Sequence, residues 1–167
     1  ALLVAFILYC VAFIMFGVSI AGKRWNSRDP EKSQKRFGRL SIVLTCIGFA
    51  AHLTYFITRW ISSKHIPTAN MFEFLTMLAM MVIAAFIVLF FIYRKPLLGF
   101  FALPISIILI AYAAVFPKEI QPLIPALKSM WLYIHVTTAA LGEAFFAVGF
   151  AAGFMYLLRT LDYGQRD

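Results

Sequence analysis

Five long apolar segments constrain the fold of this chain more than any other feature. They cover residues 2–21, 40–61, 71–93, 97–116 and 131–158. A helix needs about 20 apolar residues to cross the hydrocarbon core of a bilayer. Main-chain polar groups in hydrocarbon must be hydrogen-bonded within their own segment, so these segments are expected to be helices. The pattern predicts an all-α, polytopic transmembrane helix bundle of about five spans, forming a single domain over residues 1–167.

The composition excludes a soluble domain. Hydrophobic residues make up 63% of the chain and charged residues 13%, and the mean hydropathy is +0.89. Soluble domains contain about 45–50% apolar and about 25% charged residues. The net charge of +8 does not indicate nucleic-acid binding, because the basic residues lie in short segments between apolar runs. The first apolar segment has no basic n-region and no small-residue cleavage site, so we expect a spanning helix and not a cleaved signal peptide.

The distribution of lysine and arginine predicts the orientation. Eleven of the 15 basic residues lie at 22–39, in the turn at 94–96 or in the C-terminal tail, and the other four lie on the opposite side. Cytoplasmic segments of membrane proteins are enriched in these residues. We therefore expect a multi-pass membrane protein with its N-terminus outside and its C-terminus inside. The prediction places a basic cytoplasmic loop at 22–39 and outer loops at 62–70 and 117–130.

His135 is the residue best placed for chemistry. It follows Trp131 by four residues and Tyr133 by two, just inside the start of the fifth segment. Four helical residues rise ~6 Å, so the imidazole lies near the predicted outer interface, where Trp and Tyr are common. A neutral imidazole there is able to bind haem iron axially, with indole or phenol rings flanking the porphyrin. A histidine that caps a helix end or bonds to a neighbour fits the spacing equally well.

Two further ionisable residues fall within predicted spans. His52 lies about 18 Å along the second helix from its predicted start, past the midplane. A histidine at that depth is a functional candidate by default, although an interhelical hydrogen bond to Ser, Thr or Tyr is the favoured explanation. Glu143 lies about 12 Å inward of His135. Such a carboxylate has to pair, stay protonated or line a polar cavity.

The loop before the third segment and the first turn of that segment contain three more polar side chains of interest. His65 is expected to be a solvated loop histidine. Glu73 stands in the first turn of the third helix, where a carboxylate complements the helix dipole. Asn70 is positioned to cap that helix.

Small residues in the fifth segment predict a helix-packing face. Gly149 and Gly153 form a GxxxG pattern. Alanines at 139, 140, 144 and 147 add small positions before it. Small residues let membrane helices approach closely, so the pattern indicates packing and no specific function.

Three stretches together resemble the CcsA/ResC-type cytochrome c biogenesis proteins of the System II cytochrome c synthase, most closely ResC of Gram-positive bacteria. They are YFITRW at 55–60, HIPTANMFEF at 65–74, and WLYIHVTT at 131–138, which follows PLIPAL at 122–127. The resemblance implies a multi-pass protein of the bacterial cell membrane that binds haem at the outer membrane face. It also implies that a ResB/CcsB partner acts with the protein to deliver haem for covalent attachment to apocytochrome c. The haem would be b-type, held non-covalently before transfer.

The same resemblance assigns roles to individual residues. His135 falls on the first external histidine of the family, an axial haem ligand, and Trp131 is placed to contact the porphyrin. His65 and Glu73 match the other motif, whose role is taken to be structural support of the haem cavity. The tryptophan-rich WGxxWxWD segment and the second external histidine of the family are absent from this sequence. We therefore expect the N-terminal half of a component of a holocytochrome c synthase (haem lyase) complex, not active as this fragment.

Two other functions stay open at this stage. In the first, a b-type electron-transfer subunit would hold haem between His52 and His135. In the second, a small non-haem transporter or assembly subunit would use Glu143 as a substrate or proton site. The first predicts equal sensitivity of haem binding to both histidines, and the second predicts no bound haem.

Overall fold

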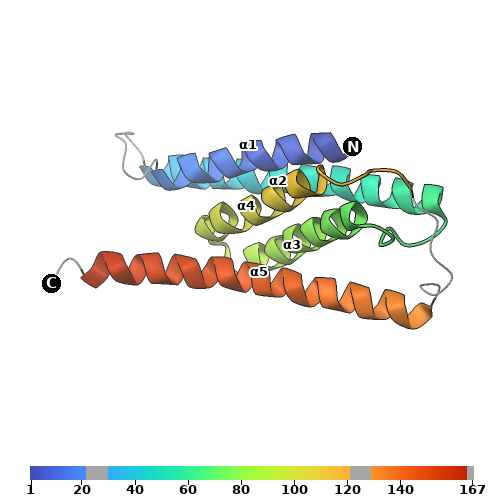
Figure 1. Ribbon diagram of the computed structural model, residues 1–167. Helices are drawn as coiled ribbons and strands as arrows, with labels where there is room; N and C mark the ends of the chain where they lie inside the picture. Colours follow the sequence, from blue (N-terminus) through green and yellow to red (C-terminus); the bar gives the residue numbers. More distant parts are fainter. Residues whose placement is uncertain (22–29, 121–128, 165–167) are drawn as a thin grey trace.

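A computed structural model describes residues 1–21, 30–120 and 129–164, and these residues form five helices with no strand among them (Figure 1). The helices are α1 (Leu2–Ala21), α2 (Pro30–Ser63), α3 (Met71–Tyr93), α4 (Pro96–Ala113) and α5 (Met130–Gly164). Each contains a segment long and apolar enough to cross a membrane. The predicted all-α, multi-pass bundle is thereby confirmed.

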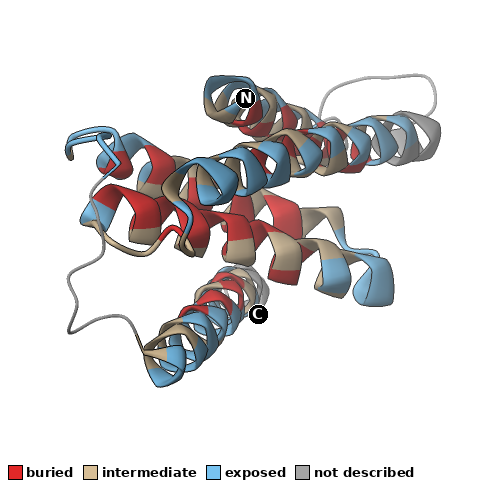
Figure 2. Cartoon of the chain, turned by 90° about the vertical axis from the view of Figure 1, so that its right-hand side faces the viewer, coloured by how far each residue is buried: buried red, intermediate tan, exposed pale blue. Residues whose placement is uncertain are grey.

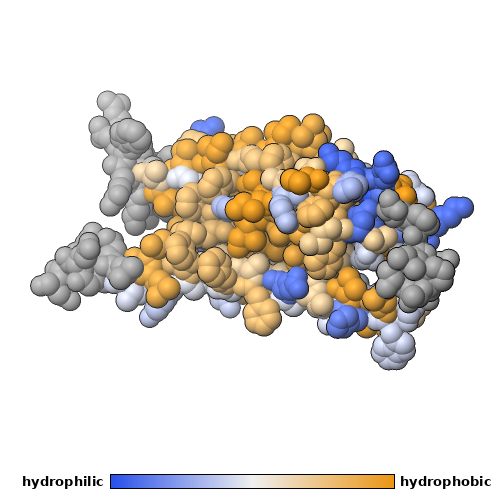
Figure 3. All heavy atoms as spheres, viewed as in Figure 1, coloured by the Kyte–Doolittle hydropathy of each residue, from blue (hydrophilic) through white to orange (hydrophobic). Residues whose placement is uncertain are grey.

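Successive helices run in opposite directions along the bundle (Figure 1). The starts of α1, α3 and α5 and the ends of α2 and α4 consequently lie at one end of the molecule. We call it the Glu73 end, after the carboxylate in the first turn of α3. Figure 3 shows hydrophobic residues over the middle of the molecule and hydrophilic residues gathered at this end.

The helix bounds agree with the sequence prediction for α1 and α3 and differ elsewhere. The second helix begins at Pro30 instead of at residue 40, so part of the basic segment is helical. Proline is favoured at the first helical position, and Glu, Lys, Gln and Arg are good helix formers, so leaving the apolar run does not end the helix. The fourth helix ends at Ala113, and single turns follow it, with the Val115 and Phe116 amides donating to main-chain oxygens three residues back.

The helices pack in three levels, with α1 and α2 on one side, α3 and α4 in the middle, and α5 on the other side (Figure 1). The core lies where α1, α3 and α4 meet, and Phe16, Phe86 and Leu103 are completely buried there. The rings of Phe16 and Phe86 meet edge to face, with their centroids 6.0 Å apart. Ser106 in α4 donates to the main-chain oxygen of Ala79 in α3 at 3.1 Å, which ties the two middle helices together.

Two glycines allow α1 to approach its neighbours closely. A Cβ atom on Gly99 of α4 would lie 2.7 Å from the Phe16 ring, and one on Gly48 of α2 would lie 2.8 Å from the Tyr9 ring. Real Cβ atoms do not come this close to ring carbons. Any larger residue at these positions would therefore displace the two aromatic side chains that anchor α1.

The fifth helix is the least buried of the five. Only 17% of its membrane-spanning window is buried, against 50% for α3. It packs against α3 and α4 along one stripe, which Figure 2 shows on the side facing the other helices. The stripe consists of Ala140, Ala144, Val148 and Ala151.

The predicted GxxxG packing face is wrong for the contacts within this chain. Gly149 and Gly153 are exposed, and a Cβ built on either would meet nothing within 4 Å. The alanines at 140 and 144 do pack, but Ala139 is exposed. Small residues occupy two sides of α5, and the stripe that faces α3 and α4 excludes the glycines.

Candidate functional site

A buried ion pair joins α2 to α3 at the Glu73 end. The Nε atom of Arg59 donates to Oε1 of Glu73 at 2.8 Å. The Arg59 side chain is 10% exposed and the Glu73 side chain is completely buried. The attraction between two charges shielded from water is strong. If one partner is removed or turned away, the other is left as a buried charge without compensation, which is costly.

The remaining bonds of Glu73 fix the start of α3. Its Oε2 atom accepts from the Ala69 amide at 2.8 Å. Its own amide donates to Oδ1 of Asn70 at 2.9 Å, and Asn70 has the extended conformation of an N-cap residue. The predicted cap is thereby confirmed, and the carboxylate lies at the helix N-terminus, where the helix dipole favours negative charge.

The network extends to the segment after α4. The main-chain oxygen of Glu119 accepts from Nδ2 of Asn70 at 3.1 Å and from Nη2 of Arg59 at 3.4 Å. The guanidinium of Arg59 also lies over the Phe72 ring, 5.2 Å from its centroid. Arg59 and Glu73 therefore connect the end of α2, the loop before α3 and the segment after α4 in one hydrogen-bonded network.

Sequence reasoning identified Glu73 but did not identify Arg59 as its partner. The available signal was the position of Arg59, within the apolar run of the second helix and on the same predicted side as Glu73. Ionisable groups in membrane helices usually pair with one another, so these two were natural partners. Nothing in the spacing of the two residues indicates the contact, because it depends on how the loop between the helices closes.

His65 is half-buried and engaged with the main chain, contrary to the expectation of a solvated residue. Its Nδ1 atom lies 2.9 Å from the main-chain oxygen of Ile66. The main-chain oxygen of His65 accepts from the Ser63 hydroxyl at 2.7 Å. These contacts shape the turn that follows α2, which also contains Lys64 with a positive φ of 59°.

His52 is a buried residue of the interface between α1 and α2. It is 1% exposed, and its Nδ1 atom lies 3.4 Å from the Tyr9 hydroxyl. The predicted interhelical hydrogen bond is thus present, and Tyr9 is the partner.

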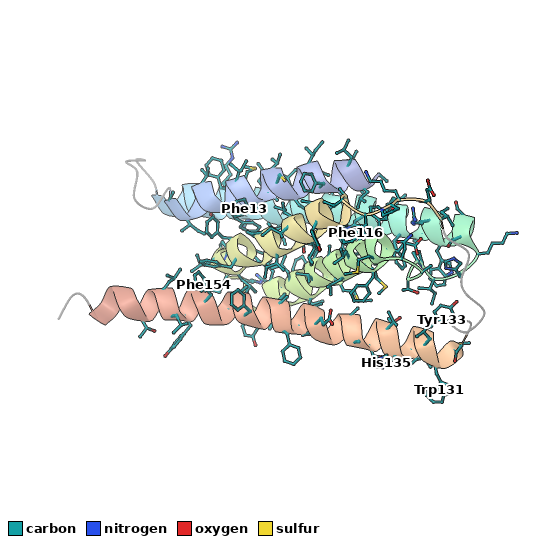
Figure 4. All side chains as sticks on the ribbon, viewed as in Figure 1. Phe13, Phe116, Trp131, Tyr133, His135 and Phe154 are labelled. Carbon is teal, nitrogen blue, oxygen red and sulfur yellow. The ribbon has the colours of Figure 1, made fainter. Side chains whose placement is uncertain are left out.

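His135 lies apart from these groups, near the start of α5. It is exposed, and no side chain in the described part of the protein forms a hydrogen bond or ion pair with it. Trp131 is 79% exposed and points away from the other helices, whereas Tyr133 faces them (Figure 4). Since residues four apart share a helix face, His135 and Trp131 present an imidazole and an indole side by side.

The structure does not bring His52 and His135 together. α5 packs against α3 and α4, and α1 and α2 lie on the far side of those two helices (Figure 1). His52 is buried in α2, where it contacts Tyr9 of α1. A haem held between these two histidines is therefore incompatible with the bundle. Within the described ranges, no cluster of three or more His, Cys, Asp or Glu residues is arranged to hold a metal ion.

Glu143 is exposed midway along α5. Among the described residues, none forms an ion pair or hydrogen bond with its side chain. A carboxylate facing hydrocarbon is costly, and the expected pairing is not made by this part of the chain. The exposed side of α5 thus combines an acidic group in mid-span with glycines that have open space beside them.

Comparison with known proteins gives one family. Residues 68–164 match the cytochrome C assembly protein family. This range contains α3, α4 and α5, and it includes both Glu73 and His135. No solved structure matches the chain.

Curated relatives carry the name cytochrome c biogenesis protein CcsA. The protein of Gloeobacter violaceus is 34% identical over 113 residues, which cover 65% of this chain and 33% of that protein. The protein of Gloeothece citriformis is 37% identical over 106 residues, covering 61% and 32% respectively. A protein of Prochlorococcus marinus is 31% identical over 154 residues, covering 90% of this chain and 47% of that protein. The matched regions thus span less than half the length of these relatives.

Proposed function

Because the chain belongs to the cytochrome c assembly family, we propose that it binds haem at the outer membrane face and presents it for covalent attachment to apocytochrome c. The observation that carries this proposal is the exposed imidazole of His135 beside Trp131, within the region that matches the family. In this proposal the Glu73 end faces outward, because eleven of the 15 basic residues occur in the sequence segments predicted to be cytoplasmic.

The residues of this chain would bind and orient the haem, which is the substrate. A ring nitrogen of His135 is the group that would ligate the iron, and the indole of Trp131 would lie against the porphyrin. Haem supplies the vinyl groups that form thioether bonds with the two cysteine thiols of a CxxCH motif. A ligand placed at the start of a membrane helix keeps the bound haem at the surface, where a protein substrate is able to reach it.

The Arg59–Glu73 network would support this site and would not touch the haem. It fixes the loop between α2 and α3 and the segment after α4, which both lie at the same end as His135. The relatives are more than twice as long as the regions they share with this chain. We therefore assign further haem contacts and the site for a ResB/CcsB-type partner to parts of the family fold outside these 167 residues.

Replacing His135 by glycine is the direct test. Haem occupancy is measured from the visible spectrum of the chain purified from haem-replete membranes, and it should fall by more than about tenfold. Mutating a residue that only supports a metal ligand already lowers metal affinity about 10–100-fold, so losing the ligand itself should have at least that effect. Added imidazole should restore the haem band, since it fills the space vacated by the ring. Thr138→Gly is a matched control on the same exposed helix and should retain full occupancy.

Two results would contradict the proposal. One is full haem occupancy in His135→Gly, which would place the iron elsewhere. The other is a wild-type chain that contains no haem, which would show that this region does not bind it unaided.

A further inference from the structure

A cavity of about 520 Å³ lies at the Glu73 end, on the opposite side of the bundle from α5. It is formed by the start of α1, the last turns of α2, the first turn of α3 and the end of α4. Its size is within the range of about 300–1,000 Å³ that is usual for sites of small ligands. His135 is not among its lining residues, so the cavity is separate from the proposed haem site.

The lining changes from polar to apolar with depth. Lys118 and Arg59 lie toward the helix ends, while Phe6 of α1 and Ile110 of α4 lie deeper in the bundle. Phe6 is four residues from Leu2, which is ~6 Å along the helix. The cavity therefore has a cationic mouth at the level where a membrane helix meets the head groups, and an apolar wall that continues toward the hydrocarbon.

The charge of the mouth favours an anion. Arg59 and Lys118 line the cavity, and no acidic residue is among its described lining residues. The Glu73 carboxylate neutralises the charge of Arg59, with Oε1 2.8 Å from Nε. Of the two basic side chains, Lys118 therefore supplies the excess positive charge. The bonds of Arg59 to Glu73 and to the Glu119 oxygen, and its contact with the Phe72 ring, also hold the guanidinium in one orientation beside the cavity.

We propose that this cavity binds one anionic phospholipid from the leaflet at the Glu73 end. Its phosphate lies between Lys118 and Arg59, and Tyr55, which also lines the cavity one helical turn before Arg59, lies beside the glycerol region. An acyl chain follows Leu2, Phe6 and Ile110 toward the middle of the bilayer. A lipid matches this lining better than haem does, because the wall contains no imidazole or thiol to ligate iron.

Native mass spectrometry of the chain in mild detergent tests the proposal. We expect the wild type to retain one phosphatidylglycerol in preference to phosphatidylcholine with the same acyl chains. Lys118→Gln should lower retention of phosphatidylglycerol about fivefold, the factor expected for one lysine at an anionic membrane surface, and should leave phosphatidylcholine unaffected. Ala114→Trp, which fills the cavity from the residue directly after α4, should lower retention of both lipids.

Lys64→Gln is the matched control, because Lys64 is an exposed cation at the same end that does not line the cavity. Equal loss of phosphatidylglycerol in Lys64→Gln and Lys118→Gln would overturn the proposal, as would equal retention of the two lipids by the wild type. Displacement of the lipid by millimolar glycerol 3-phosphate would show a site for the phosphate alone. Displacement by equimolar haemin would assign the cavity to haem. Either displacement would also overturn the proposal.

Discussion

Replacing Glu73 by leucine is expected to destabilise the bundle by about 3–5 kcal/mol, the usual cost of removing one partner from a buried ion pair. The substitution would leave the Arg59 guanidinium, which is only 10% exposed, without its counter-charge. It would also leave the Ala69 amide without its acceptor. The measurement is the free energy of unfolding of the purified chain in mixed micelles, titrated with a denaturing detergent.

A double-mutant cycle separates the pair from its two members. Arg59→Met alone should be destabilising to a similar degree, because it leaves the Glu73 carboxylate buried and unpaired. The double variant Arg59→Met/Glu73→Leu should recover much of the loss, since two apolar side chains of similar volume have no charge to desolvate. Additive losses in the double variant would show that the two side chains do not interact.

Glu119→Leu is the matched control for this cycle. Glu119 lies at the same end and takes part in the network only through its main-chain oxygen, and its side chain is exposed. Removing that carboxylate should change the free energy of unfolding by no more than about 0.5 kcal/mol, as for most surface substitutions. A loss as large as that of Glu73→Leu would mean that net charge at this end, and not the ion pair, determines stability.

The sequence was sufficient to predict the helices because the bilayer imposes one length scale on all of them. Met71–Tyr93 follows directly from an apolar run that begins at a capping asparagine and ends at basic residues. The start of α2 was predicted too late for the complementary reason. Hydrophobicity locates only the part of a helix that lies inside the membrane. Polar residues with high helix propensity extend the helix into water, and hydropathy does not indicate where that extension begins.

The sequence predicts that a buried polar side chain has a hydrogen-bond or ion-pair partner, but it does not predict which residue that partner is. The depth of His52 predicts a hydrogen-bond partner on another helix, and Tyr9 provides it. Which residue does so depends on the close approach of α1 to α2 at Gly48, a contact between segments far apart in the sequence. The pairing of Arg59 with Glu73 likewise depends on the path of the intervening loop. These features are tertiary, and no local pattern specifies them.

The rotation of α5 was the least predictable element of the fold. Its glycines and its alanines form two stripes, and either is compatible with close packing. The alanine stripe faces α3 and α4, so His135, Trp131, Glu143 and the glycines are exposed. The orientation of one helix thereby determines that the proposed haem ligand is accessible.

Replacing Ala144 by leucine should therefore disturb both the packing of α5 and the position of His135. Ala144 is completely buried in the stripe against α3 and α4, and overpacking at such a position costs about 1–3 kcal/mol. The same change at Ala139, which is exposed on another face of α5 five residues earlier, adds the same side chain without a clash and should stay within about 0.5 kcal/mol of wild type. The measurement is again unfolding in mixed micelles, combined with the haem spectrum of each variant.

The comparison of the two leucine variants distinguishes the observed stripe from its alternative. If Ala144→Leu is destabilising and lowers haem occupancy while Ala139→Leu does neither, α5 is oriented as the structure has it. The reverse order of effects would show that α5 packs through its other side, as the GxxxG pattern predicted. In that case His135 would face the bundle, and an imidazole enclosed among helices would no longer be available to a haem at the membrane surface.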